Sequence, residues 1–258
     1  MTFAVRLLAT LRSILYTPIY LVLFVIIMLL FLLFTWIPGQ RKIQDLIIRA
    51  WAWVSLFPFG IRTHAAGFEN VPPNEGFLYV FNHQSHLDIP VCCATLPRSF
   101  RFGAKIELYR IPLFGSVLRR MGALPIARQN RQAVFRVYEE AKERARKGEV
   151  FILAPEGTRQ DRPEVGPFKM GPFVLAIDME MPIVPVVLYG AFEALPKGHL
   201  LINPRRFVRH VHVQILPPVL TKGMSHKDRV DLQNRVREKM LSAYAELRSR
   251  VNKSESSI

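Results

Sequence analysis

The chain has almost no cysteine. Its only two, Cys92 and Cys93, are adjacent, so they cannot form a disulfide that joins distant segments. The lack of a disulfide framework fits a domain that faces the reducing cytosol. The surrounding segment, residues 89–94, has the pattern of a buried helix face. We therefore expect no chemistry from either thiol.

Two common catalytic motifs are also missing. No Gly-x-Ser-x-Gly sequence is present to supply a serine nucleophile, and neither cysteine is next to a histidine. No Gly-Lys dipeptide occurs in the chain, so a P-loop nucleotide enzyme is not supported. The sequence therefore favours chemistry that needs neither a serine or cysteine nucleophile nor a bound nucleoside triphosphate.

Charge is absent from a long stretch near the amino terminus. Residues 13–40 contain no charged side chain, and Ile19–Ile37 is almost entirely aliphatic or aromatic. As a helix, this inner segment spans roughly 28 Å, about the thickness of the hydrocarbon core of a bilayer. The run is too long for a secretory signal peptide, and no small-x-small cleavage site follows it. We expect an uncleaved membrane anchor.

A second apolar stretch, Ile43–Phe59, is rich in aromatic residues and suits a segment that lies at the level of the lipid headgroups. Both a spanning helix and a helical pair that dips into one leaflet agree with this pattern. Two basic residues precede the apolar run and two follow it, so the flanking charges do not settle its orientation.

The rest of the chain is strongly basic, because the net charge is +15 and only two basic residues precede residue 40. Nucleic acid and anionic lipid both suit this charge, and the anchor favours lipid. Apolar segments typical of buried strands alternate with helical patterns beyond Gly60. The predicted strands are Gly76–Phe81, Val150–Ala154, Ile183–Leu188 and Val211–Leu216, and the predicted helices are Arg131–Lys147 and one that begins at Ser225.

This alternation predicts an α/β fold with a mixed, mostly parallel sheet that is flanked by helices and preceded by the hydrophobic anchoring helix or helix pair. We expect the anchor over residues 1–60, the α/β domain over 61–251 and a polar tail over 252–258. Ligands gather at the carboxyl ends of the strands in such sheets.

The segment Asn82–Asp88 follows a predicted buried strand and places His83 and Asp88 five positions apart. A histidine can remove a proton near neutral pH, and a fixed carboxylate can hold its ring in one tautomer and stabilise the cation that forms. Five residues of a regular helix would leave the two groups apart around its axis. We therefore expect His83 in the loop or the first turn, with Asp88 reaching back from the helix.

This segment has two other interpretations. Ser85 and Asp88 fit a helix capping box, which would make the carboxylate structural. A metal site is the second alternative, and its ligands would come from the imidazoles and carboxylate of His83, His86 and Asp88, with further imidazoles from His210 and His212.

Two further segments carry groups that suit anion binding. In Pro155–Arg159, Gly157 permits positive φ, Arg159 offers a planar fork for phosphate or carboxylate oxygens, and Glu156 could orient that arginine or accept a substrate hydroxyl. Lys105 and Arg128 bracket an apolar segment that could form the wall of a groove. The alternatives are an ordinary turn with a surface ion pair and core packing with two solvated charges.

At this point the chain resembles the glycerolipid acyltransferase family, in particular the bacterial 1-acyl-glycerol-3-phosphate acyltransferases. The matching blocks, in the order and spacing of the family, are Asn82–Asp88, Lys105–Arg128, Pro155–Arg159 and Ile183–Val186. The resemblance covers roughly residues 65–220, and an amino-terminal hydrophobic anchor is also typical of the family. The first and third blocks are highly specific when they occur together.

By this resemblance, His83 is the general base and Asp88 its partner. The residues implied in binding the glycerol phosphate of the acceptor are Glu156, Gly157, Thr158 and Arg159, with assistance from Arg128, Lys105 and Lys169. Three positions depart from the usual pattern of the family, and they loosen any assignment of the acceptor: Ala127, Ala154 and Met170.

The resemblance implies a membrane-bound enzyme that moves a fatty acyl group from acyl-CoA or acyl-carrier protein to the free hydroxyl of 1-acyl-glycerol-3-phosphate, giving phosphatidic acid for phospholipid biosynthesis. Another lyso-lipid, such as a lysophospholipid or a lyso-amino-acid lipid, is the alternative acceptor. No metal or redox cofactor and no nucleic-acid partner are expected. The catalytic domain would face the cytosol from the cytoplasmic or inner membrane.

Two functions from other classes compete with this interpretation. One is a metal-dependent hydrolase that uses His83, His86 and Asp88. The other is a non-catalytic tether that binds anionic lipid or nucleic acid through the basic surface.

Overall fold

The computed structural model describes residues 3–37, 39, 41–126 and 131–256. Its strands form one sheet in the order β1-β7-β6-β2-β5-β3-β4. The pair β6–β7 is antiparallel, and the other neighbours in this order are parallel. The strands are β1 (Ile61–Ala66), β2 (Leu78–Phe81), β3 (Phe100–Lys105), β4 (Leu124–Ile126), β5 (Val150–Leu153), β6 (Ile183–Tyr189) and β7 (Arg209–Ile215).

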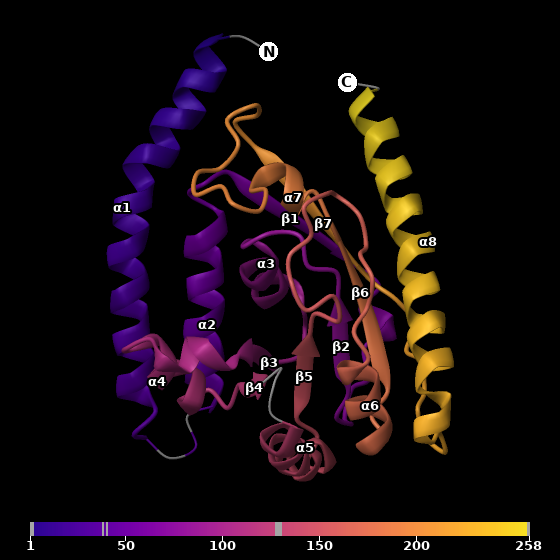
Figure 1. Ribbon diagram of the computed structural model, residues 1–258. Helices are drawn as coiled ribbons and strands as arrows, with labels where there is room; N and C mark the ends of the chain where they lie inside the picture. Colours follow the sequence, from indigo (N-terminus) through magenta and orange to yellow (C-terminus); the bar gives the residue numbers. More distant parts are fainter. Residues whose placement is uncertain (1–2, 38, 40, 127–130, 257–258) are drawn as a thin grey trace.

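Helices cover both faces of the sheet, so the molecule has three layers (Figure 1). The helices are α1 (Phe3–Phe34), α2 (Arg41–Leu56), α3 (Asp88–Thr95), α4 (Phe114–Arg120), α5 (Arg131–Arg146), α6 (Gly171–Asp178), α7 (Ala191–Ala194) and α8 (Arg229–Ser256). One face packs against α1 to α4, and the other packs against α5, α6 and α8. The predicted fold class, a mixed and mostly parallel sheet flanked by helices, is confirmed.

The central strands have continuous apolar sequences because they are buried on both faces. Every residue of β2, β5 and β6 is buried. Three strands were not foreseen in the sequence. The short strand β4 and the edge strand β1 have little apolar pattern, and β3 contains the buried, ion-paired Arg101 and a glycine. The last helix continues to Ser256, through most of the predicted polar tail.

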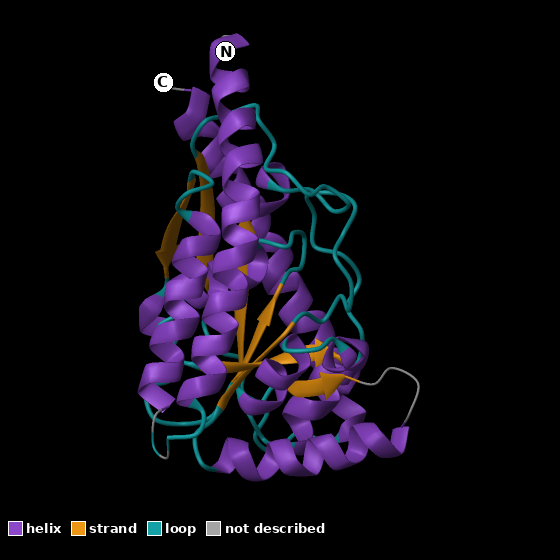
Figure 2. Cartoon of the chain, turned by 90° about the vertical axis from the view of Figure 1, so that its left-hand side faces the viewer, coloured by secondary structure: helices purple, strands orange, loops and turns teal. Residues whose placement is uncertain are grey.

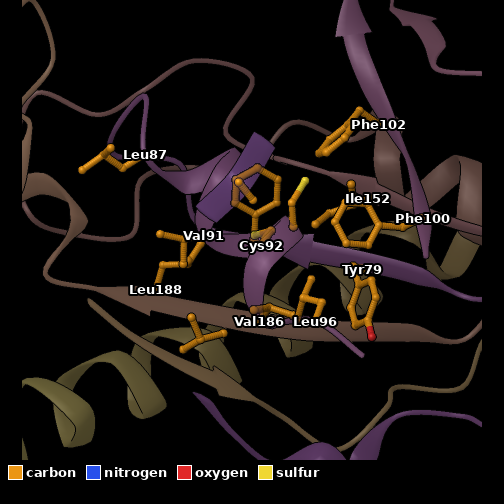
Figure 3. Close-up of a cluster of buried hydrophobic side chains, with 14 of the residues drawn as sticks. Tyr79, Leu87, Val91, Cys92, Leu96, Phe100, Phe102, Ile152, Val186 and Leu188 are labelled. Carbon is orange, nitrogen blue, oxygen red and sulfur yellow. The ribbon is translucent and has the colours of Figure 1, made fainter. Parts of the chain in front are cut away.

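The core beneath the loop after β2 is formed by α3 and the middle of the sheet. Val91 and Cys92 of α3, and Leu96 just after it, lie against side chains of β2, β3, β5 and β6 (Figure 3). Both cysteines are free and buried, and burial raises the pKa of both thiols. They are apolar packing residues, as the sequence predicts.

Helix α1 lies beside the folded domain along much of its length (Figures 1 and 2). Arg12 of this helix stacks on Phe207, and Phe24 lies against Phe114 of α4. It is long and apolar enough to cross a membrane, and most of its surface is uncovered by the rest of the protein. The division into anchor, domain and tail at residues 60 and 251 stays a prediction.

Candidate active site

The Asn82–Asp88 segment lies where β2 ends. In the sheet order, β2 stands between β5 and β6, so the loops that follow these three strands meet at one edge. His83 is in the loop after β2, Asp88 is the first residue of α3, and the Pro155–Arg159 turn follows β5. The two predicted motifs therefore come together although they are about 70 residues apart in the sequence.

The imidazole of His83 is hydrogen-bonded to the carboxylate of Asp88. Nδ1 of the ring lies 2.8 Å from Oδ2 of Asp88, whose side chain is fully buried, while the histidine side chain remains 22% exposed. Because an ionised carboxylate can only accept, Nδ1 carries the hydrogen and the lone pair of a neutral ring is on Nε2. A partly exposed ring with its lone pair on Nε2 can act as a general base.

The same carboxylate oxygen also fixes the loop backbone. Oδ2 of Asp88 accepts hydrogen bonds from the backbone N–H groups of Gln84 (2.7 Å) and Ser85 (2.9 Å). The bond from Ser85 is half of the capping box that the sequence offers as an alternative. The other half is not formed, because the hydroxyl oxygen of Ser85 accepts from the backbone N–H of Leu87 (3.1 Å) and not from that of Asp88. The same hydroxyl donates to the carbonyl of Leu195 (2.7 Å). Asp88 thus combines a structural role with the orientation of the histidine.

Neighbouring polar side chains fasten this loop to other elements. Asn82 exchanges two hydrogen bonds with the backbone of Leu188 on β6, at 2.8 and 2.9 Å. Gln84 donates to the carbonyl of Glu164 (3.0 Å) and to the hydroxyl of Tyr244 on α8 (3.2 Å). These residues hold the His83 loop between the loop after β5 and two distant segments.

Glu156 lies beneath the His83 loop. Its side chain is buried, and Oε1 accepts a hydrogen bond from the backbone N–H of His83 (3.2 Å). Burial raises the pKa of this carboxyl to about 8, against the opposing effect of its hydrogen bonds. The observed contact is with the catalytic loop and not with Arg159. The direct substrate contact that the resemblance implies for Glu156 stays a prediction.

Arg159 lies beside the histidine loop. Its neighbour Gln160 donates its backbone N–H to the carbonyl of His83 (2.9 Å). Its charge also reaches His86, whose pKa is lowered by partial desolvation and by the positive charge of Arg159. The Nη1 atom of Arg159 is buried and has no hydrogen-bond partner among the described residues. A buried guanidinium nitrogen in this state favours an anionic ligand.

The other predicted site residues are placed as follows. Gly157 has φ of +71°, the left-handed conformation that its position in the turn predicts, and Thr158 beside it is exposed. Lys105 ends β3, two strands away from β2, and its ammonium lies 3.5 Å from Glu107 on the surface. Lys169 is exposed. Arg128 lies outside the described residues, and the roles implied for these side chains stay predictions.

The metal-binding alternative is not supported by this geometry. His210 and His212 lie on β7, two strands away from β2. Both stack on His64 of β1, and Nδ1 of His210 lies 2.7 Å from Nε2 of His64. They do not converge with His83. Across the described ranges, no group of three or more His, Cys, Asp or Glu side chains is arranged to hold a metal ion.

The positioning roles of Asn82 and Gln84 were not predicted, and Ser85 was considered only as part of a capping box. Their partners are 80 to 160 residues away in the sequence. A polar residue beside a buried strand signals that a partner is needed, but it does not identify which one.

Known proteins resemble this chain in sequence and in structure. A family model described as Acyltransferase matches residues 62–189. The human 1-acyl-sn-glycerol-3-phosphate acyltransferase alpha is 31% identical over 210 residues, which are 80% of this chain and 72% of that protein. A chloroplastic 1-acyl-sn-glycerol-3-phosphate acyltransferase of Brassica napus is 34% identical over 160 residues, 62% of this chain and 46% of the relative. The chain spans about half the length of such plant relatives.

The fold is also similar to a solved structure. The crystal structure of the 1-acyl-sn-glycerophosphate (LPA) acyltransferase PlsC from Thermotoga maritima superimposes with a TM-score of 0.77 at 25% identity. The match covers 93% of this chain and 98% of that one.

The pKa of Glu156 predicts how stability changes with pH. The folded protein holds this proton up to about pH 8, whereas the unfolded chain loses it near the ordinary value of 4.5. The stabilisation from this group is therefore full below that ordinary value and is lost as the pH rises to about 8. We expect the melting temperature to fall over this range by less in Glu156→Gln than in the wild type.

The measurement is a series of thermal unfolding curves between pH 5 and 8 in one detergent. Glu238→Gln removes an exposed carboxylate of α8 and is the matched control, which should follow the wild type. If the melting temperatures of Glu156→Gln and the wild type changed equally with pH, the raised pKa of Glu156 would be contradicted.

Proposed function

Because this chain belongs to the glycerolipid acyltransferase family, we propose that it transfers a fatty acyl group from a thioester to the free hydroxyl of 1-acyl-glycerol-3-phosphate and forms phosphatidic acid. One observation carries the proposal. His83 is hydrogen-bonded to the buried carboxylate of Asp88, and its loop is bonded to the turn that contains Arg159. Nη1 of Arg159 is buried and has no hydrogen-bond partner among the described residues. A base beside an anion clamp suits an acceptor that carries a hydroxyl and a phosphate.

His83 supplies the base in the proposed reaction. Nε2 takes the proton of the acceptor hydroxyl as its oxygen attacks the thioester carbonyl, and Asp88 stabilises the imidazolium that forms. Collapse of the tetrahedral intermediate expels the thiolate, which takes up a proton, and leaves the new ester. A positioned base contributes on the order of 10²–10⁴ in rate. Holding hydroxyl and thioester in contact contributes several kcal/mol more.

Arg159 supplies the anion clamp. A guanidinium can form two parallel hydrogen bonds to the oxygens of a phosphate monoester, and such charge-assisted bonds are strong where water is excluded. Binding the phosphate here fixes the glycerol backbone, and its free hydroxyl then comes within reach of His83. A lysophospholipid or another lyso-lipid is the alternative acceptor. The phosphate monoester is favoured because it offers the most oxygens and charge to this fork.

The donor is a CoA or acyl-carrier-protein thioester, and the transfer is direct. The carbonyl of a thioester is already activated, so the proposed reaction needs no metal or redox cofactor. Cys92 and Cys93 are buried with raised pKa values, which does not favour an acyl-enzyme on either thiol.

The position of α1 favours membrane binding within one leaflet. Arg12 of α1 stacks on Phe207, and Trp36, which follows the end of α1, stacks with Arg120 of α4. A helix that crossed the bilayer upright would carry these charged neighbours into the hydrocarbon core. An α1 that lies along the membrane surface keeps them at the headgroup level and keeps its exposed apolar face in lipid. The catalytic domain would then face the cytosol, where its thioester donors are made.

Replacing the base tests the chemical step. His83→Ala should reduce acyl transfer to phosphatidic acid by at least about 10², because the hydroxyl loses its proton acceptor. The assay uses labelled acyl-CoA and lysophosphatidic acid at saturating concentrations, with the melting temperature measured beside it. His226→Ala replaces an exposed histidine in the 3-10 turn just before α8; it is the matched control and should keep wild-type activity. Substantial transfer by folded His83→Ala would refute the assigned base.

Replacing the clamp tests acceptor binding. Arg159→Ala should raise the KM for lysophosphatidic acid by about 10- to 100-fold, since a hydrogen bond to a charged group contributes about 1.5–3 kcal/mol. The KM for the thioester should change by less than about twofold. Steady-state kinetics with each substrate varied in turn separates the two constants. If Arg159→Ala kept the wild-type KM for lysophosphatidic acid, the assignment of Arg159 to the phosphate site would be refuted.

A further inference from the structure

A cavity lies beside the segments to which the His83 loop is bonded. It has a volume of about 1180 Å³ and is walled mainly by residues 189–206, the segment that joins β6 to β7. Thr10 and Ser13 of α1 close one side, and Val251 and Asn252 of α8 close another. In Figure 1 this segment is the orange loop at the end of the molecule that carries both chain termini. The cavity has room for a ligand larger than a lipid headgroup.

The walls of this cavity are strongly basic. Three arginines line it, namely Arg205, Arg206 and Arg209, and Glu193 is the only acidic residue among its described lining residues. Arg209 is buried and holds the loop closed, because its guanidinium donates twice to the carbonyl of Asn203, at 2.8 and 3.0 Å. Arg205 and Arg206 are exposed. Such a set is suited to phosphate groups.

The cavity is connected to the catalytic loop by direct contacts. Ser85 donates to the carbonyl of Leu195, and Pro196, the next residue, lines the cavity. Gln84 donates to the carbonyl of Glu164, and the preceding Pro163 lines the cavity too. Two residues of the catalytic segment thus bond directly to the chain that forms the walls. A ligand held here would lie beside the segments to which the His83 loop is bonded.

We propose that this cavity binds the phosphate-bearing nucleotide end of a CoA thioester, with Arg205 and Arg206 as ligands of its phosphates. This inference rests on the proposed function and adds the choice and the site of the donor. CoA carries three phosphates on one nucleotide, and its pantetheine arm then runs to the catalytic loop with the thioester at its end. Phe192, which also lines the cavity, offers an aromatic face for the adenine.

The volume and charge of the cavity favour a CoA thioester over the alternative ligands. An acyl-carrier protein presents a folded acidic surface, which would dock on an outer face and leave the cavity unfilled. An anionic lipid headgroup would fill only a small part of about 1180 Å³. A nucleotide has both the size and the charge that the walls accommodate.

A binding experiment tests the site without relying on turnover. Adenosine 3′,5′-bisphosphate is the probe, and its affinity is measured by calorimetry on the full chain in detergent. The double variant Arg205→Ala/Arg206→Ala should bind the probe at least about tenfold more weakly than the wild type. The matched control, Arg235→Ala/Lys239→Ala, removes two exposed charges of α8 and should bind as the wild type does.

Kinetics then separates donor recognition from the other possibilities. The double variant should raise the KM for oleoyl-CoA about tenfold, with unchanged constants for oleoyl-pantetheine and for lysophosphatidic acid. No binding of the probe by the wild type, or equal binding by wild type and double variant, overturns the inference. The inference is also overturned if the double variant loses only its activity with acyl-carrier-protein donors, or only its binding to anionic vesicles. If the wild type binds the probe but transfers no acyl group to any acceptor, the proposed function fails and the nucleotide site stands.

Discussion

The site depends on one buried carboxylate. Asp88 is removed from water, and one of its oxygens receives the imidazole of His83 and two backbone N–H groups. A desolvated charge is costly unless such donors compensate it, so the loop cannot easily relax without exposing or orphaning that charge. The ring orientation, the loop conformation and the start of α3 are therefore fixed together. This coupling explains how a short loop holds a base in one orientation.

The topology of the sheet brings Arg159 beside the loop that this carboxylate holds. Because β5 is a parallel neighbour of β2, its following turn emerges at the same edge and places Arg159 beside the histidine loop. Glu156 at the start of that turn bonds to the backbone of His83, while Asn82 fastens the same loop to β6. The loop is thus held from both neighbouring strands. Rigid placement of this kind is what a base and an anion clamp need in order to act on one acceptor.

Much of this arrangement could be predicted from the sequence, and the exceptions have physical reasons. The apolar runs at β2, β5 and β6 identified the central strands, and the terminal helix begins after a capping box at Ser225. The edge strand β1 and the short β4 carry almost no periodic signal. The burial of Glu156 and the contacts of Gln84 depend on residues far away in the chain, so one-dimensional patterns do not reveal them. The basic cavity could not be predicted because Arg205 and Arg206 look like ordinary surface charge in the sequence, and only the fold places them with Arg209 around one cavity.

The most direct test of the account is the tautomer of His83, measured from its imidazole nitrogen-15 shifts with selective labelling and assignment by His83→Gln. A neutral ring bonded to Asp88 through Nδ1 should show hydrogen on Nδ1 and a free lone pair on Nε2. Asp88→Asn should abolish that preference. Hydrogen on Nε2 of the neutral ring in the wild-type protein would contradict the central claim, since the nitrogen that faces the acceptor could not then receive its proton.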